Sequence, residues 1–261
     1  MSSGSESEVV SWRTESDGVM VVTLERPPAN ALGIPILDGM HAAIDAAEAT
    51  GDVKVMVVTS ALDGFFAAGA DIKHMSTIDA ESFTAYGDKM RAVNDRLSAA
   101  GWISIAAVDG LALGGGLELA MACTLRVSGP RGQFGLPEVK LGLIPGAGGT
   151  QRLPRLVGRG RALEIMLTAR QVPAAEALEI GLVDRLTDGD VVKAALEFAA
   201  QLIGPSLPAQ LAIVRTVDAA FDLPLAEGMA FEVAQEQGLF EHGEAAEGIS
   251  AFIAKRPPNF A

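Results

Sequence analysis

Apolar runs alternate with segments of helical periodicity along the first part of the chain. Runs rich in β-branched residues over 19–24, 53–59 and 103–108 predict buried strands. Between them, apolar residues recur at helical spacing over 36–49 and 80–100, and each segment stops within two residues of a glycine. Strands that alternate with helices predict an α/β fold for this part of the chain.

The pattern changes after Leu125, where the apolar runs shorten, and again after Pro145, where it becomes almost wholly helical. Short runs over 125–128 and 133–136 predict the last strands. Helical periodicity then covers six segments, namely 158–168, 174–180, 191–202, 208–220, 225–241 and 244–255.

Proline and glycine divide the C-terminal helical series. Gly204, Pro205 and Pro208 follow one another closely, and such clusters punctuate the chain between structural units. The first eight residues are polar and acidic, which is typical of a disordered tail. The sequence therefore predicts a tail over 1–8, a core over 9–200 and a helical module over 201–261.

Charge and hydropathy narrow the range of partners. The 33 acidic residues outnumber the 20 Lys and Arg, and the net charge of −13 opposes binding to nucleic acid and to anionic membrane surfaces. No run approaches the roughly 18 apolar residues of a membrane span. The N-terminus lacks the pattern of a signal peptide. We expect a soluble, cytoplasmic protein.

Cysteine and histidine, which bind zinc and other transition metals, are scarce. Cys123 is the single cysteine, so an internal disulfide and a cysteine-based zinc cluster are excluded. We expect Cys123 to be a small buried apolar side chain. His41, His74 and His242 are widely separated, and none has metal-ligand spacing to another histidine. The sequence therefore predicts no metal site.

Three consecutive glycines, 114–116, run into an apolar segment that carries one carboxylate, Glu118. A helix that opens at Gly115 or Gly116 would present free N–H groups to an oxygen that gains negative charge. The alternative is that the glycines only allow a tight turn and close packing. Because the residues around Glu118 leave no polar face, a carboxylate there must be compensated or used.

Two further stretches have unusual composition. Residues 134–158 contain Glu138 and a glycine-rich segment that matches neither a dinucleotide fingerprint nor a phosphate loop. Residues 63–75 place Gly69 and Ala70 before a capping Asp71, so backbone donors could be exposed there as well. The alternatives are that Glu138 is a solvated glutamate and that residues 63–75 form an ordinary strand-to-helix connection, and spacing alone does not bring Glu118 and Glu138 together.

Taken in this order, the stretches resemble the crotonase superfamily, and most closely its enoyl-CoA hydratases. The matching segments are ERPPANAL (25–32), AAGADIK (67–73), AAVDGLALGGGLELAMAC (106–123), FGLPEVKLGLIPGAGGTQRL (134–153) and AFIAKRPPNF (251–260). The resemblance implies a spiral of ββα repeats with C-terminal helices that build a homotrimer or a dimer of trimers. It also implies hydration of 2-enoyl-CoA thioesters to 3-hydroxyacyl-CoA, as in fatty acid β-oxidation.

The resemblance also implies site residues. The N–H groups of Ala70 and Gly115 would form an oxyanion hole for the thioester carbonyl, with Glu118 as base and Glu138 as acid. No resident cofactor is implied, because coenzyme A enters with the substrate. The expected substrate and CoA contacts are Ala68, Asp71, Ile72, Lys73, Gly114 and Lys255.

Other functions stay open at this point. A Δ3,Δ2-enoyl-CoA isomerase or another crotonase lyase would use one carboxylate to shuttle a proton. A non-catalytic acyl-CoA binder or a structural subunit would bind the thioester without turnover. The presence of both Glu118 and Glu138 in one chain favours the hydratase.

Overall fold

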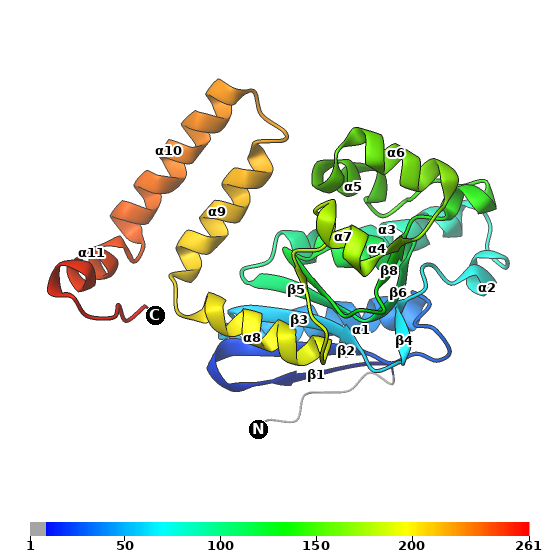
Figure 1. Cartoon of the computed structure of the whole chain (residues 1–261), viewed down its shortest axis with the longest axis horizontal. Coiled ribbons are helices and arrows are strands. Elements are labelled where there is room, and N and C mark those ends of the chain that lie inside the picture. Colours follow the sequence, from blue (N-terminus) through cyan, green and yellow to red (C-terminus); the bar gives the residue numbers. More distant parts are fainter. Residues whose placement is uncertain (1–8, 261) are drawn as a thin grey trace.

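The computed structural model describes residues 9–260, so the tail predicted over 1–8 lies outside the described residues. Two sheets and the helices between them form a mixed α/β core, and the last helices stand away from it (Figure 1). The α/β fold predicted from the sequence is therefore confirmed.

The larger sheet has six strands. In spatial order they are β1 (Val10–Thr14), β2 (Val19–Leu24), β3 (Val55–Ser60), β5 (Ile103–Val108), β7 (Leu125–Ser128) and β10 (Arg185–Leu186). Only the pairing of β1 with β2 is antiparallel among these described strands. The central strands β2, β3 and β5 are largely apolar runs because both faces of the sheet are covered there.

The smaller sheet, together with the larger one, shows a repeating unit in the chain. Its strands are β4 (Gly64–Ala67), β6 (Gly110–Leu113), β8 (Gln133–Gly135) and β9 (Val172–Pro173). Strands β4, β6 and β8 each follow a strand of the larger sheet and pair in parallel with one another. The chain thus repeats a long strand, a short strand and a helix, as the resemblance implied.

Helices cover both faces of the larger sheet. On one face lie α1 (Ile34–Thr50), α3 (Ala80–Ser98) and α4 (Gly115–Ala122), and on the other lies α8 (Val191–Ile203). Along β2, Met20 and Val22 belong to the apolar cluster under α1, α3 and α4, whereas Val19 and Val21 belong to the cluster under α8. This alternation follows from the two-residue period of a strand.

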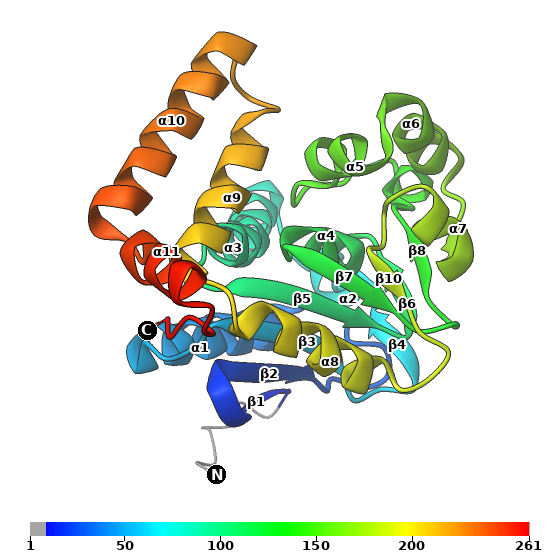
Figure 2. The ribbon, with the colours of Figure 1, turned by 60° about the vertical axis from the view of Figure 1, so that its left-hand side comes forward.

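The remaining helices lie around the core. They are α2 (Ile72–Met75), α5 (Gly149–Val157), α6 (Arg159–Thr168), α7 (Ala174–Glu179), α9 (Leu207–Ala219), α10 (Leu225–His242) and α11 (Ala245–Ala254), with short 3-10 turns η1 (Ser16–Gly18) and η2 (Glu138–Leu141). Helices α9 and α10 extend side by side away from the sheets (Figure 2). Helix α8 runs across residue 200 and ends at Ile203, so the division between a core and a helical module stays a prediction. No helix among residues 9–260 combines the length and apolar character needed to span a bilayer.

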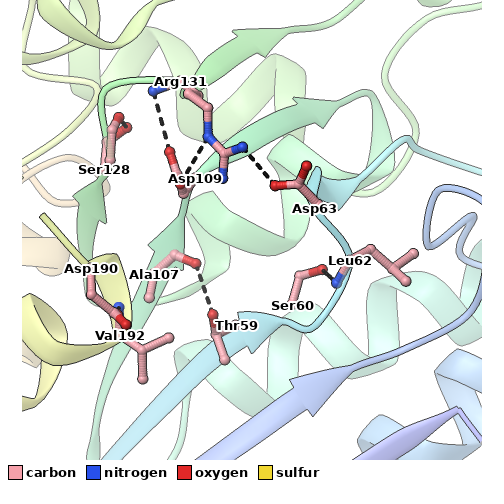
Figure 3. Close-up of polar contacts among 11 residues, drawn as sticks. Thr59, Ser60, Leu62, Asp63, Ala107, Asp109, Ser128, Arg131, Asp190 and Val192 are labelled. Atoms are coloured by element: carbon pink, nitrogen blue, oxygen red, sulfur yellow. Dashed lines mark hydrogen bonds and ion pairs between the residues drawn. The ribbon is translucent and has the colours of Figure 1, made fainter.

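The carboxyl ends of β3, β5 and β7 form a polar region beside a cavity of about 310 Å³ (Figure 3). Arg131 lies between two carboxylates, with Nη1 2.6 Å from Asp63 Oδ1 and Nη2 2.7 Å from Asp109 Oδ2. The Thr59 hydroxyl donates to the Ala107 carbonyl at 3.3 Å. Arg131, which follows β7, therefore forms salt bridges to the segments that follow β3 and β5.

A buried arginine fixes the end of α4. The Arg126 side chain, 4% exposed, lies 3.0 Å from Asp184 Oδ2 through Nη2. Its Nε donates to the Leu182 carbonyl at 2.8 Å, and its Nη1 donates to the Cys123 carbonyl at 3.0 Å. Cys123 is itself buried, as predicted, and burial raises the pKa of its thiol to about 12.

Replacement of Asp184 by Ala would leave the Arg126 guanidinium buried without its counter-charge. We expect Asp184→Ala to lower the free energy of unfolding by about 3 kcal/mol, measured by urea denaturation. The exposed Arg13–Glu15 pair provides the control, and Glu15→Ala should cost less than about 1 kcal/mol. Equal losses for the two variants would contradict the role given to Arg126.

Candidate active site

A cavity of about 580 Å³ lies beside the N-terminus of α4. Segment 68–70, α2, α3 and the segment that follows β8 form its other walls. Much of the lining is apolar, and these side chains include Ile72, Met75, Phe83, Tyr86, Met90, Leu141, Leu143 and Ile144. Glu118 and Glu138 both open into this space. A mainly apolar pocket with a few convergent polar groups is the usual form of a small-molecule site.

The glycines before α4 allow its backbone to approach β4 closely. A Cβ placed on Gly116 would lie 2.1 Å from the Ala67 carbonyl oxygen, a contact that no side chain could make. Gly114, with φ of +51°, turns the chain from β6 into the helix. The glycines therefore do allow close packing of the α4 backbone against β4, as one interpretation of the sequence predicted. The same contact also brings the N-terminus of α4 to the cavity.

Two backbone N–H groups meet at this contact. A Cβ placed on Gly115 would lie 3.6 Å from the Ala70 nitrogen, and one placed on Gly69 would lie 3.6 Å from the Gly115 nitrogen. Within residues 9–260, neither the Ala70 N–H nor the Gly115 N–H donates a hydrogen bond to the protein. Both residues line the cavity. The pair can therefore donate to one oxygen of a bound molecule.

Glu118 is 1% exposed and receives two backbone hydrogen bonds. The N–H groups of Ala147 and Gly149 donate to its Oε1 at 2.7 and 2.8 Å. Burial raises the pKa of Glu118, and these two hydrogen bonds oppose that effect. The two hydrogen bonds thus offset part of the cost of burying the Glu118 carboxylate, which remains accessible from the cavity.

Two side chains of α3 hold the segment that binds Glu118. Asn94 Nδ2 donates to the Ala147 carbonyl at 3.0 Å, and Arg91 Nη1 donates to the Gly146 carbonyl at 2.8 Å. The Gly146–Ala147 peptide group is therefore fixed at its oxygen by Arg91 while its nitrogen donates to Glu118, and Asn94 fixes the oxygen of the next peptide group.

Glu138 begins η2 and has a different environment. Its Oε2 is buried and has no hydrogen-bond partner among the described residues. A Cβ placed on Gly114 would lie 2.9 Å from its Oε1, and the positive φ of Gly114 also disfavours any other residue there. Burial, together with the smaller effect of the negative charge of Glu118, raises the pKa of Glu138 to about 7. Near neutral pH this group exists in both protonation states.

Most of the residues expected from the sequence meet at this cavity. Ala68, Ala70, Ile72, Gly114, Gly115, Glu118 and Glu138 all line it. Asp71 instead forms an ion pair with Arg26 at 2.8 Å and caps α2. Lys73 and Lys255 do not line the cavity within this chain, and Lys255 lies just beyond α11. The roles of these three residues stay predictions.

Sequence reasoning missed the supporting residues Tyr86, Arg91 and Asn94. Tyr86 and Asn94 are buried on α3, on the same face as the apolar Met90 between them. Two polar residues, each four positions from Met90 on one helix face, were the available signal. Within residues 9–260, no group of three His, Cys, Asp or Glu side chains is placed to hold a metal ion, and the absence of a metal site stays a prediction.

The raised pKa of Glu138 predicts a pH-dependent gain in stability on substitution. Between pH 4.5 and about 7 the folded protein keeps a proton that the unfolded chain has lost, so stability falls as pH rises through this window. After allowance for solvent screening, Glu138→Gln should raise the free energy of unfolding at pH 8 by about 2 kcal/mol. Urea titrations should show this gain shrinking towards pH 4.5. A gain that does not depend on pH would contradict the assignment.

Comparison with known proteins agrees with this geometry. The family model described as enoyl-CoA hydratase/isomerase matches residues 14–261. A probable enoyl-CoA hydratase of Rhizobium meliloti is 40% identical over 247 residues, which cover 93% of this chain and 94% of the relative. A mouse mitochondrial methylglutaconyl-CoA hydratase is 34% identical over 94% of this chain and 80% of its own length. An enoyl-CoA hydratase structure from Geobacillus kaustophilus superposes with a TM-score of 0.92 at 34% identity, covering 98% of this chain and 97% of that chain. The chain therefore belongs to the enoyl-CoA hydratase/isomerase family.

Proposed function

We propose that the protein adds water to the double bond of 2-enoyl-CoA thioesters and forms 3-hydroxyacyl-CoA. One observation carries the proposal: the buried carboxylate of Glu118 and the half-buried one of Glu138 open into the same cavity as two adjacent backbone N–H groups that have no acceptor among the described residues. The names of the relatives, several of them enoyl-CoA hydratases, support the same activity.

The reaction needs a site for negative charge. When water attacks Cβ of the enoyl group, electron density moves through Cα to the thioester oxygen and gives an enolate-like transition state. The N–H groups of Ala70 and Gly115 would bind this oxygen, and each such donor typically contributes about 100-fold to 1,000-fold in rate. Because both groups belong to the fixed backbone, they require little reorganisation during the reaction.

The reaction also needs two proton transfers. Glu118 would accept a proton from water as its oxygen bonds to Cβ, and Glu138 would deliver a proton to Cα. The two hydrogen bonds from the backbone both end on Glu118 Oε1, so Oε2 is the oxygen offered to water. A pKa of about 7 lets Glu138 carry a proton under neutral conditions. Together the two steps add one water molecule and leave the sum of the two glutamates' protons unchanged.

Replacement of either glutamate should remove one of these transfers. We expect Glu118→Gln and Glu138→Gln each to lower kcat for crotonyl-CoA hydration by about 100-fold to 10,000-fold, followed by loss of the conjugated thioester absorbance. Glu179→Gln, an exposed position on α7, is the matched control and should keep full activity. Near-full activity in Glu118→Gln with normal substrate binding would show the base to be misassigned. If the wild-type protein instead isomerises 3-enoyl-CoA and hydrates nothing, the isomerase replaces the hydratase.

Coenzyme A carries several negative charges, and this acidic chain must meet them locally. Lys73 lies on α2, whose neighbouring residues Ile72 and Met75 line the cavity, and it would bind the nucleotide phosphates from there. Lys255 would have to come from a second copy of the chain, because it does not line the cavity of its own chain. We expect no resident cofactor.

The C-terminal helices supply a surface for such a second copy. Helix α10 has no buried residue, and Phe252 on α11 is 85% exposed. The other exposed apolar side chains of α9 to α11 include Ile213, Val217, Leu225, Met229, Val233, Phe240, Ile249 and Ile253. An apolar surface of this kind marks a protein interface, and we propose a homotrimer or a dimer of trimers.

Light scattering coupled to gel filtration would measure the assembly. We expect a mass of three or six times the 27.0 kDa chain for the wild-type protein. Phe252→Glu should lower this mass because it introduces a charge into the interface. Leu167→Glu alters an exposed apolar residue on α6, outside the C-terminal helices, and should retain at least a trimer. A monomeric wild-type protein would exclude the proposed assembly.

A further inference from the structure

We propose that the Tyr86 hydroxyl is a positioning group for the Ala70 N–H, and that it sets how strongly this site polarises the thioester carbonyl. The inference rests on the proposed function, since it assigns the Ala70 N–H to the carbonyl oxygen. Tyr86 itself acts through the backbone on either side of Ala70 and bonds to no reacting atom.

The Tyr86 hydroxyl joins two segments that are far apart in the sequence. It donates to the Leu32 carbonyl at 2.5 Å and accepts the N–H of Asp71 at 2.9 Å. Tyr86 is 2% exposed, and burial raises the pKa of its hydroxyl, which therefore keeps its proton as a donor. The Tyr86 hydroxyl oxygen thus bridges segment 31–33 and the segment that carries Ala70 by two hydrogen bonds.

Two hydrogen bonds fix the peptide groups before and after the Ala70 Cα, and the first of these groups contains the Ala70 N–H. The Leu32 N–H donates to the Gly69 carbonyl at 2.7 Å, and this carbonyl belongs to the same peptide group as the Ala70 nitrogen. The next peptide nitrogen, that of Asp71, is held by Tyr86. Gly69 has a φ of +99°, a conformation that glycine tolerates but does not itself enforce. The direction of the Ala70 N–H therefore depends on these external bonds.

A separate ion pair holds the same segments together without Tyr86. Arg26 Nη2 lies 2.8 Å from Asp71 Oδ2, and Arg26 Nη1 donates to the Ala31 carbonyl at 2.7 Å. Asp71 Oδ1 accepts the N–H of His74 at 3.1 Å and so caps α2. Removal of the Tyr86 hydroxyl would leave these contacts intact. The Asp71 N–H would then lose its acceptor, and the Ala70 peptide would keep only the bond from the Leu32 N–H, so its orientation would be less fixed while the fold of the segment remains.

Tyr86→Phe removes this one oxygen and retains the ring, which packs edge-to-face against His74 with centroids 5.2 Å apart. The probe is para-dimethylaminocinnamoyl-CoA, whose absorbance moves to longer wavelength when its carbonyl is polarised. We expect the wild-type protein to cause a red shift and Tyr86→Phe to cause a clearly smaller one at saturation. For crotonyl-CoA, kcat should fall by about 10-fold to 100-fold with little change in KM.

Thr50→Val is the matched control. Thr50 ends α1 outside the lining of the cavity, and its hydroxyl donates to the Ala47 carbonyl of its own helix. This variant loses a hydroxyl as Tyr86→Phe does and should keep the full red shift and the wild-type kcat. Thermal unfolding of both variants should stay close to that of the wild type.

A full red shift and unchanged kcat in Tyr86→Phe would overturn the inference, as would the absence of any red shift in the wild-type protein. The spectral comparison does not require turnover. A wild-type protein that shifts the probe but hydrates no enoyl thioester would therefore contradict the proposed function alone, and the smaller shift of Tyr86→Phe would still support the role of Tyr86.

Discussion

The close approach of the α4 backbone to β4 is the contact on which the rest of the site depends. Because position 116 can carry no Cβ beside the Ala67 carbonyl, the helix N-terminus lies against the strand without an intervening side chain. This contact brings the Gly115 nitrogen next to that of Ala70, and it leaves the unpaired donors of the helix facing the cavity. Close packing and an anion-binding site are therefore two results of one backbone geometry.

The two carboxylates share the cavity but differ in their surroundings. Glu118 receives two backbone hydrogen bonds that offset part of its burial, whereas Glu138 has a buried oxygen with no partner among the described residues. Hydrogen bonds to the charged form favour ionisation, and burial without them favours the proton. Environments that push two carboxyl groups towards different protonation states separate a base from an acid. The local structure thus gives two identical side chains different tendencies.

The sequence predicted the elements whose pattern is long and regular. Strands β2 and β5 begin and end where the apolar runs over 19–24 and 103–108 do, and helices α3 and α8 lie within two residues of their predicted bounds. It missed β4 and β6, because four residues rich in glycine and alanine carry no period, and their pairing is set by tertiary contacts. The meeting of Glu118 with Glu138 came from the resemblance, since no spacing rule relates residues joined only through the spiral. Tyr86 was missed because its function lies in bonds to backbone atoms.

The site also shows how a rigid backbone donor can be maintained beside a cavity. Neither the Ala70 nor the Gly115 N–H has an acceptor within the described chain, and an unpaired donor would ordinarily turn towards any available carbonyl. At Gly115 the helix prevents this, because residues 115–118 are locked by the first turn of α4. Segment 68–71 has no such helix, and it is instead tied by the Leu32 N–H, the Tyr86 hydroxyl and the Arg26 guanidinium. The two halves of the same donor pair are therefore held by different means, one by regular secondary structure and the other by side chains from distant parts of the sequence.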